Sequence, residues 1–305
     1  MINGIINVYK EKGYTSHDVV AKMRGILRIK KIGHTGTLDP DAEGVLPVCI
    51  GKATKLVDLI TNKDKTYEAV LKLGITTDTQ DITGTVLTRK DVTVTIPEIE
   101  EAIRSYIGEY MQLPPMYSAI KVNGKKLYEL ARQGKEVERK RRKVYIHDIR
   151  ILKIDALQHE VSMSVDCGKG TYIRTLLHDI GETLGCGGTM KSLTRTAVGD
   201  FHLKDAYKLS EIEKMVHNEQ INTIVYPIDG IFSDYSRITV AREYSKLIYN
   251  GNPFQTSHLT EPIQYPSTDW VRVYDADDDF IGIYQYDYGR KSYRPVKLFM
   301  TKHTI

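Results

Sequence analysis

Apolar residues recur every three or four positions in three stretches of the chain, which is the spacing that gives a helix one buried face. We therefore predict helices over residues 16–27, 97–107 and 172–184. Glycines follow the second and third stretches, at Gly108 and Gly185, and glycine is the residue that most often ends a helix. The sequence thus contains at least three amphipathic helices.

Other stretches alternate apolar and polar residues, as a half-buried strand does. The alternation is clearest over residues 67–73, which Gly74 follows, and residues 144–151 and 161–167 look like a pair of strands. Strands and helices do not alternate regularly along the chain. The pattern therefore favours an α+β fold with a central mixed or antiparallel sheet over a doubly wound fold.

The pattern changes after about residue 230, where acidic or glycine-containing turns separate short strand-like runs. These runs are 238–240, 270–274, 280–286 and 295–299. Short strands with turn signals between them predict a small all-β barrel. Because 305 residues are many for one compact domain, we predict a main domain over residues 1–230 and a second domain over residues 231–305.

The composition is that of an ordinary globular protein, with 41% hydrophobic and 27% charged residues. No basic stretch followed by an apolar run opens the chain, and no apolar run approaches the length of a membrane span. Cys49, Cys167 and Cys186 lie far apart without CxxC spacing, which argues against a disulfide framework and a structural zinc site. We expect a cytoplasmic protein without a metal or a membrane anchor.

Positive charge is concentrated in residues 121–143, here called the basic segment. It holds ten Lys or Arg and three Glu, a net of +7, whereas the whole chain carries +4. Such a segment can neutralise phosphates and release counterions, but a charge run is equally often a solvated loop. Tyr117 and Tyr128 can stack on unpaired bases, which favours RNA. The candidate RNA-binding residues are Lys121, Arg132, Arg139, Lys140, Arg141, Arg142 and Lys143.

The second predicted domain is electrically balanced. Residues 231–305 contain nine basic and nine acidic residues. Any RNA contact there must come from local patches, and one candidate patch consists of Arg290, Lys291, Arg294 and Lys297.

The most informative stretch is residues 33–44, GHTGTLDPDAEG, here called the catalytic loop. Its three glycines allow backbone angles that other residues avoid, and Asp39-Pro40 favours a turn. A carboxylate on such a loop can approach a substrate as a nucleophile or a general base. The alternative is a turn in which the Asp39 side chain only bonds its own backbone.

Two other motifs were considered and carry less weight. Gly51-Lys52 ends like a phosphate-binding loop but lacks both the first glycine of that loop and the Ser or Thr after the lysine. A nucleotide triphosphatase is therefore not expected. Asp39, Asp41 and Glu43 could be the carboxylates of a glycosidase, but they lie close together along one turn. The glycosidase is kept only as a competing interpretation.

Several longer motifs resemble those of the TruB family of tRNA pseudouridine synthases. The catalytic loop resembles the active-site motif of that family. The other matching blocks are residues 7–16, 65–67, 77–84, 112–121, 167–174 and 193–196. The blocks keep the order of the family over roughly residues 4–200, and several long motifs in register are a specific signal.

This resemblance implies roles for individual residues. Asp39 would be the catalytic carboxylate, and Arg174 would pair with it and hold it ionised and oriented. Tyr67 would stack on the target base close to its ribose, and His34 would stack beneath the RNA where that base leaves its loop. The other pocket residues would be Lys10, Asp81, Tyr172 and Leu193.

The pattern of residues alone leaves simpler interpretations open for some of these positions. Tyr67 and Leu193 fit core positions equally well, and Arg174, near a helix start, could bind a backbone phosphate.

The resemblance further implies that uridine 55 in the T arm of tRNA is isomerised to pseudouridine. The fold would be the pseudouridine synthase α+β domain, with residues 117–143 as an insertion that closes over the RNA, and the C-terminal part resembles a PUA-type RNA-binding domain. The reaction gains no atoms or electrons, so no cofactor and no metal are implied. Asp39 could attack C1′ or C6, or cleavage could proceed by elimination of the ribose 2′ proton. We expect a monomer that needs no protein partner and acts on the tRNA T stem-loop.

Two other functions are compared with this one. A base-exchanging tRNA transglycosylase also uses a carboxylate nucleophile, but the sequence lacks the clustered Cys and His zinc ligands of one major group. The third is a non-catalytic tRNA chaperone. Loss of catalysis has no support from the sequence, because Asp39, Tyr67 and Arg174 are all intact, although assistance of tRNA folding could coexist with catalysis.

Overall fold

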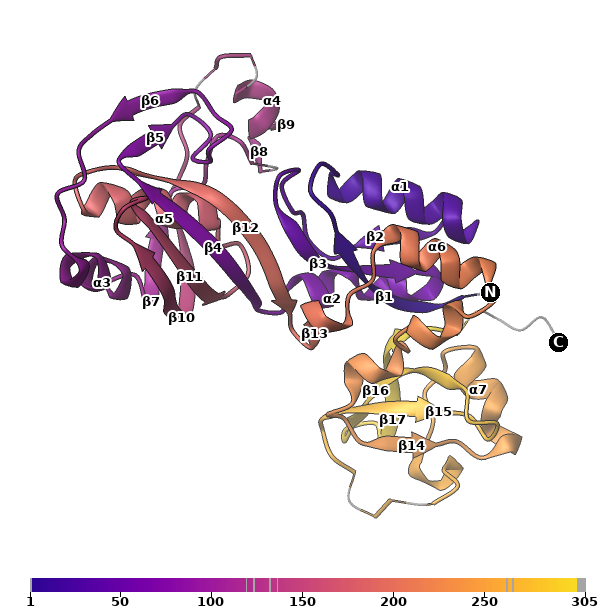
Figure 1. Cartoon of the computed structure of the whole chain (residues 1–305). Helices are drawn as coiled ribbons and strands as arrows, with labels where there is room; N and C mark the ends of the chain where they lie inside the picture. Colours follow the sequence, from indigo (N-terminus) through magenta and orange to yellow (C-terminus); the bar gives the residue numbers. More distant parts are fainter. Residues whose placement is uncertain are drawn as a thin grey trace.

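The structure is a computed structural model that describes residues 2–118, 120–122, 124–131, 133–135, 137–261, 263–264 and 266–300. These residues form a nine-stranded mixed sheet and a four-stranded sheet near the C-terminus, and helices pack on both (Figure 1). None of the described helices is both long enough and apolar enough to cross a bilayer.

The main sheet has the order β1-β3-β12-β4-β11-β10-β7, with β2 paired to β3 and β13 paired to β12. Its strands are β1 (Gly4–Lys10), β2 (Ile32–His34), β3 (Glu43–Ile50), β4 (Lys65–Leu73), β7 (Gly108–Gln112), β10 (Arg142–Asp155), β11 (Glu160–Cys167), β12 (Gly188–Val198) and β13 (Phe201–His202). Neighbouring strands are antiparallel except β12 and β3, which are parallel. The predicted α+β fold with a mixed sheet and the predicted pair of strands, β10 and β11, are confirmed.

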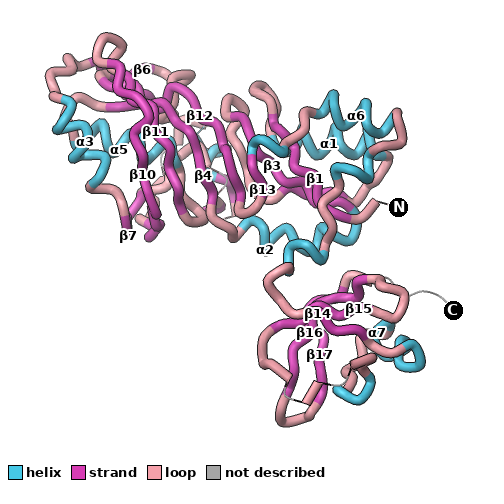
Figure 2. The backbone as a smooth tube through the Cα atoms, turned by 60° about the horizontal axis from the view of Figure 1, so that its bottom comes forward, coloured by secondary structure: helices cyan, strands magenta, loops and turns pink. Residues whose placement is uncertain are grey.

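Helices α1 (Ser16–Leu27) and α6 (Leu209–His217) cover one side of β1 and β3 (Figure 2). The sequence specifies the start of α1 locally: Thr15 and Asp18 form a capping box, in which each side chain bonds the backbone N–H of the other residue. The apolar stripe of α1 then packs on the sheet through Val19 and Met23, which are both buried. The predicted helix over residues 16–27 is confirmed.

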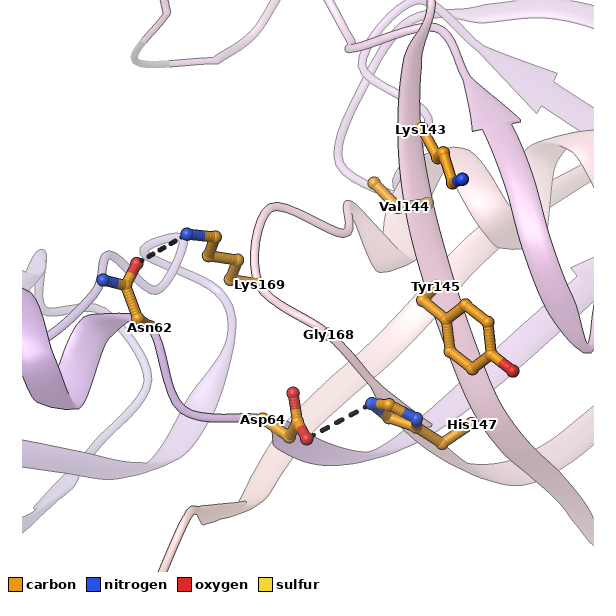
Figure 3. A pocket seen from close by; sticks show the side chains of 8 residues that line it. All are labelled: Asn62, Asp64, Lys143, Val144, Tyr145, His147, Gly168 and Lys169. Carbon is orange, nitrogen blue, oxygen red and sulfur yellow. Dashed lines mark hydrogen bonds and ion pairs between the residues drawn. The ribbon is translucent and has the colours of Figure 1, made fainter. Parts of the chain in front are cut away.

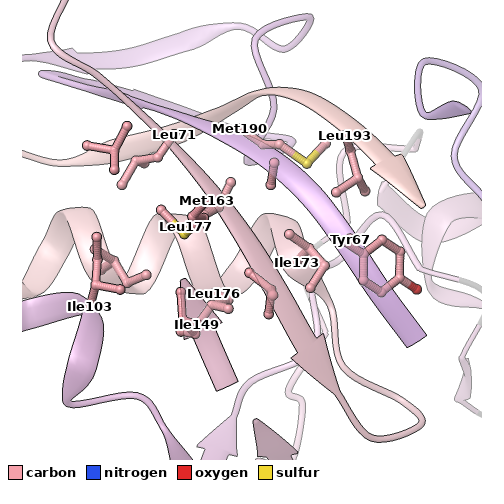
Figure 4. Packing of buried hydrophobic residues seen from close by; sticks show 14 of the residues in the cluster. Tyr67, Leu71, Ile103, Ile149, Met163, Ile173, Leu176, Leu177, Met190 and Leu193 are labelled. Carbon is pink, nitrogen blue, oxygen red and sulfur yellow. The ribbon is translucent and has the colours of Figure 1, made fainter. Parts of the chain in front are cut away.

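A second core lies under the other half of the sheet, where α5 (Ile173–Thr183) and α3 (Ile96–Arg104) pack against β4 and β11 (Figure 4). The alternating residues of β4 face this core, as their pattern predicts, and Tyr67 is one of them. The predicted helix over residues 172–184 is confirmed to within one residue at each end.

The predicted helix over residues 97–107 is wrong at its C-terminal end. The helix α3 ends at Arg104, residues 105–107 form a turn, and β7 begins at Gly108. Gly108 has φ of +103°, a conformation that favours glycine and lets the chain turn directly into a strand. The apolar periodicity continued to Ile107, but it could not show that the last residues belong to this turn.

Shorter elements connect these layers. They are the 3-10 helix η1 (Gly51–Leu56), α2 (Val57–Thr61), the hairpins β5 (Ile75–Thr77) with β6 (Val86–Arg89) and β8 (Lys121–Val122) with β9 (Lys125–Lys126), and α4 (Leu127–Ala131).

The C-terminal sheet has the order β14-β15-β16-β17. Its elements are β14 (Arg237–Thr239), α7 (Ser245–Tyr249), β15 (Trp270–Tyr274), β16 (Phe280–Asp287) and β17 (Ser292–Leu298). The four predicted strands are present, but no closed barrel is found among the described residues. The strand β14 pairs with β15 and β17 with β16, and the other bridge of β17 is a single one from Tyr293 to Phe254. The segment between β14 and β15 contributes α7 instead, and its Ile248 is buried in the core of this sheet.

The two sheets share a hydrophobic cluster. Ile283 and Phe299 of the C-terminal sheet region pack together with Ile5 and Val45 of the main sheet, and all four are buried. Figure 2 shows α2 and the C-terminal sheet on the side of β1 and β3 opposite to α1 and α6. The two sheets are therefore packed against each other. The domain boundary at residue 230 stays a prediction.

Candidate active site

The catalytic loop connects β2 to β3, and a buried lysine fixes its shape. Lys10 is fully buried, and its Nζ donates to the carbonyl oxygens of Ala42 at 2.6 Å and of Pro40 and Glu11 at 3.1 Å each. Because Pro40 and Ala42 follow Asp39 closely, the ammonium group restrains the backbone that carries this carboxylate. Burial lowers the pKa of Lys10 to about 8.

Arg195 of β12 supports the same loop from below and was not among the residues singled out in the sequence. Only 1% of its surface is exposed, and its Nε donates to the Val45 carbonyl at 2.7 Å and its Nη2 to the Gly36 carbonyl at 3.3 Å. Gly44 has φ of +108°, and a Cβ there would lie 2.2 Å from the Arg195 carbonyl oxygen. An arginine inside a strand was the available sequence signal, but the pattern did not show that it is buried.

Arg174 joins the catalytic loop to helix α5. Its Nε lies 2.9 Å from Asp39 Oδ2 and its Nη2 lies 3.3 Å from Asp39 Oδ1, which is a bidentate contact. The same guanidinium donates to the carbonyls of Thr79 at 3.0 Å and Tyr117 at 2.8 Å, and lies 3.7 Å from Asp81. Arg174 thus binds the catalytic loop at Asp39, the loop at Thr79 and the segment at Tyr117. The expected Asp39–Arg174 pair is present.

Burial and the neighbouring charges shift the pKa of the Asp39 carboxyl in different directions. Burial raises the pKa of the Asp39 carboxyl, the positive charges of Arg174 and Lys10 lower it, and the negative charge of Asp81 raises it. The net direction is upward, so Arg174 lessens the effect of burial on the pKa and does not reverse it. The Asp39 side chain keeps 38% of its surface exposed, which leaves the carboxylate accessible to a substrate.

Tyr67 and Leu193 lie on neighbouring strands of the main sheet. Tyr67 of β4 is opposite Arg195 of β12, and Leu193 is opposite Ala69 of β4. Both are buried parts of the second core (Figure 4). Burial raises the pKa of the Tyr67 hydroxyl, and the charge of Asp39 acts in the same direction. The phenol therefore stays neutral, and its hydroxyl is close enough to Asp39 for that charge to act on it.

Tyr172 and His34 complete the set of expected pocket residues. Gln112 binds both backbone groups of Tyr172, accepting from its N–H at 2.8 Å and donating to its carbonyl at 3.0 Å. His34 at the end of β2 is half-buried and meets His17 edge-to-face, with ring centroids 5.2 Å apart. Burial lowers the pKa of His34, so its imidazole is neutral at neutral pH.

The basic segment is described only in part. Arg132 lies outside the described residues, and of Lys121 only the backbone, in β8, is described. The guanidinium groups of Arg139 and Arg141 donate to the carbonyls of Pro114 at 3.0 Å and Met111 at 2.9 Å. The other three members of the run are the exposed Lys140, Arg142, whose charge acts on the Tyr172 hydroxyl, and Lys143, which pairs with Glu109.

An open pocket of about 500 Å³ lies beside the loop that leads from β11 to Tyr172 (Figure 3). It is lined by Asn62, Asp64, Lys143, Val144, Tyr145, His147, Gly168 and Lys169. His147 pairs with Asp64 at 3.3 Å, Lys169 donates to Asn62 at 3.0 Å, and Tyr145 is 47% exposed. Among the lining residues, Lys143 is a candidate RNA-binding residue, and Gly168 and Lys169 belong to the matching block 167–174.

The described residues form no metal site or disulfide beside the Asp39 carboxylate. In the part of the chain that the structure describes, no three His, Cys, Asp or Glu side chains cluster as metal ligands would. The three cysteines are free and buried, and burial raises the pKa of the Cys49 and Cys167 thiols to about 12.

The chain is similar to known proteins over nearly its whole length. Residues 24–173 match the family described as TruB family pseudouridylate synthase (N terminal domain), and residues 174–233 match the tRNA pseudouridylate synthase B C-terminal domain. The chain is 56% identical to the tRNA pseudouridine synthase B of Lachnoclostridium phytofermentans, over 98% of this chain and 100% of that protein. It is 47% identical to the protein of the same name from Alkaliphilus oremlandii, over 99% and 100% of the two chains.

Solved structures show the same fold. An H/ACA ribonucleoprotein bound to a substrate RNA containing 2′-deoxyuridine has a chain that matches 98% of this one with a TM-score of 0.71 at 23% identity, and the match covers 86% of that chain. A Cbf5–Nop10–Gar1 complex matches with the same TM-score at 25% identity, covering 98% of this chain and 85% of the other.

Proposed function

The chain belongs to the TruB family and isomerises uridine in tRNA to pseudouridine, and on this premise we propose that it acts on uridine 55 of the T arm with Asp39 as the catalytic carboxylate. The observation that supports this assignment is the bidentate contact of Arg174 with Asp39, on a loop that Lys10 and Arg195 hold rigidly. A preorganised carboxylate next to a neutral aromatic ring fits a reaction on a flipped nucleotide.

The reaction breaks the bond from C1′ to N1 and forms a bond from C1′ to C5. The base has to rotate between these events, C5 then loses its proton, and N1 gains one. Asp39 attacks C1′ or C6, or the glycosidic bond is cleaved by elimination of the ribose 2′ proton near Tyr67. In each case we propose that Tyr67 stacks on the base and that Arg174 orients Asp39.

The remaining pocket residues have supporting roles in this proposal. Leu193 and Tyr172 line the pocket, and His34 stacks beneath the RNA where the base leaves its loop. Asp81 shares the Arg174 guanidinium with Asp39. The Lys10 ammonium is occupied by three carbonyl groups, so we propose that Lys10 acts by positioning the catalytic loop.

The partner of this site is the T stem-loop of tRNA. Its phosphates would be bound by the basic segment, where Lys140 and Arg142 are exposed and the charge of Arg142 acts on Tyr172. The C-terminal sheet would be a PUA-like RNA-binding module. We infer a cytoplasmic monomer, and the similarity to bacterial enzymes named for tRNA modification supports this location.

Tritium release from tRNA transcripts that carry 5-tritiated uridine tests the proposal. Isomerisation removes the hydrogen from C5, whereas base exchange and simple binding do not. The wild-type protein should release tritium in proportion to the uridine converted, and Asp39→Asn should abolish release. Asp41→Asn is the matched control, because Asp41 is an exposed carboxylate on the same loop, 3.9 Å from Lys12, without contact to Arg174.

The result separates the alternatives. If Asp39→Asn protein bound tRNA and still released tritium at the wild-type rate, the assignment of Asp39 would be wrong. If a folded, tRNA-binding wild-type protein released none, a chaperone or a base-exchanging enzyme would be the better interpretation.

A further inference from the structure

Four lysines gather where η1, the start of β2 and the end of β17 meet. We call Lys31, Lys52, Lys55 and Lys297 the lysine cluster. The backbone brings them together: the Lys31 carbonyl accepts from Gly51 N–H at 2.8 Å, next to Lys52. Lys55 Nζ donates to the Leu298 carbonyl at 2.7 Å, next to Lys297. Three segments that are far apart in the sequence thus contribute to one basic surface.

These charges are not compensated by ion pairs. Within the residues that the structure describes, none of the four ammonium groups has a carboxylate oxygen within 4.0 Å. Asp229 and Asp279 line a small pocket together with Lys52 but make no such pair with it. Burial, and then the charges of Lys31, Lys52 and Lys297, lower the pKa of Lys55. The fold therefore holds like charges together at a cost, although Lys31 and Lys55 are exposed.

The cluster is close to the active site but separate from it. Lys31 immediately precedes β2, whose other end is His34, so the two residues are roughly 10 Å apart along an extended strand. The catalytic loop begins at that other end, and the cluster extends from there toward the C-terminal sheet. Figure 1 shows this sheet beside β1 and α2, away from the insertion near α4. A polyanion whose nucleotide occupies the active site can therefore continue onto the cluster.

We propose that the lysine cluster binds the phosphate backbone of the tRNA substrate outside the T arm. This inference rests on the proposed function, because the substrate of the neighbouring site is itself the polyanion that would occupy the cluster. Each neutralised phosphate releases counterions, so the contact contributes affinity that depends steeply on salt and not on sequence. The T loop is positioned by the active site, and the cluster adds a second point of attachment on the same molecule.

The test compares a full-length tRNA transcript with an isolated T-arm hairpin. The variant Lys31→Gln/Lys55→Gln removes two exposed charges of the cluster, and Lys204→Gln/Lys214→Gln, at exposed lysines next to and within α6, is the control with the same change in net charge. Binding is measured in the Asp39→Asn background by titration at several salt concentrations. Isomerisation is measured separately in the otherwise wild-type protein, and thermal unfolding checks that each variant is folded.

For full-length tRNA we expect Kd to rise about tenfold in the cluster variant, and the slope of log K against log [salt] to fall by about 1.8, which is 0.9 for each lost contact. Kd for the hairpin and the turnover number at saturating tRNA should not change, and the control should resemble the parent protein.

Equal weakening for hairpin and tRNA would overturn the inference, because it would place the contact in the T arm. If neither RNA bound the cluster variant more weakly, the inference would also be overturned, and the cluster would bind a different polyanion. Because binding is measured with Asp39→Asn, a failure of the proposed chemistry in the isomerisation assay remains distinguishable from a failure of this inference.

Discussion

At the scale of single residues, the site depends on the balance of forces on Asp39. Burial favours the neutral carboxyl and Arg174 favours the carboxylate. Arg174 also binds the Thr79 and Tyr117 carbonyls, so it both lessens the effect of burial on the Asp39 pKa and positions the loops around Asp39. Lysine cannot replace this fork of donors, because its ammonium is a single point charge.

We predict that Arg174→Met moves the acid limb of the pH dependence of kcat/KM to higher pH. The carboxylate is the active form, its pKa is already raised by burial, and loss of the guanidinium removes an interaction that lowers it. Activity would therefore be lost at a higher pH as the solution is acidified. Arg174→Lys, which keeps the charge, should lower the rate while moving the limb less.

Initial rates of pseudouridine formation between about pH 5 and 9 would measure this shift, with thermal unfolding recorded at each pH. A uniform loss of rate with an unmoved acid limb would mean that Arg174 acts only by positioning.

At the scale of elements, the catalytic loop is specified by the way β3 and β12 approach each other. The two strands run parallel at Gly44 and Arg195, where there is no room for a side chain. Lys10 from β1 and Arg195 from β12 then satisfy the loop carbonyls from two sides. The loop is thus held in its shape by the sheet beneath it.

We predict that Gly44→Ala destabilises the protein more than Gly13→Ala. Both glycines have a positive φ, so each alanine incurs roughly 1–2 kcal/mol of backbone strain. Only at Gly44 does the added Cβ also meet backbone, 2.2 Å from the Arg195 carbonyl oxygen, whereas nothing lies within 4 Å at Gly13. Urea unfolding of the two variants measures the difference. Equal losses of stability would show that the close approach of the strands is unimportant.

At the scale of the whole molecule, the C-terminal sheet is attached through a shared core. Phe299 is buried among residues of both sheets, and Lys55 of the main part bonds the adjacent Leu298 carbonyl. This attachment gives the lysine cluster a defined geometry, since Lys297 comes from one sheet region and the other three lysines from the other. The C-terminal sheet is therefore expected to unfold together with the main sheet.

We predict that Phe299→Ala lowers the free energy of unfolding by about 3–5 kcal/mol, as expected for a buried aromatic side chain. Val296→Ala, in β17 three residues before Phe299, is the control, because Val296 is 44% exposed, and its effect should be much smaller. Denaturant unfolding followed by far-UV circular dichroism and by the fluorescence of Trp270 measures both. If Phe299→Ala split the transition and left the main sheet at its wild-type stability, the two sheets would be independent.

Much of the fold and the contact between Asp39 and Arg174 were predictable from the sequence, whereas the catalytic roles of these residues stay predictions. The helix over residues 16–27, the strand over 67–73 and the helix near 172–184 have strong periodicity and local start or stop signals, so neighbouring residues are sufficient to specify them. The motifs around Asp39, Tyr67 and Arg174 also identified the residues that the structure brings together.

Only the tertiary structure decided which distant groups meet and what they are buried against. Asp39 and Arg174 are 135 positions apart in the sequence. The upward shift of the Asp39 pKa depends on burial, which no motif encodes. Periodicity likewise could not separate the end of α3 from the turn that follows it, nor an open C-terminal sheet from a barrel. Arg195 under the catalytic loop and the four lysines of the cluster come from separate segments. Periodicity and capping act between residues a few positions apart, whereas ion pairing, desolvation and strand closure depend on contacts that exist only once the chain is folded.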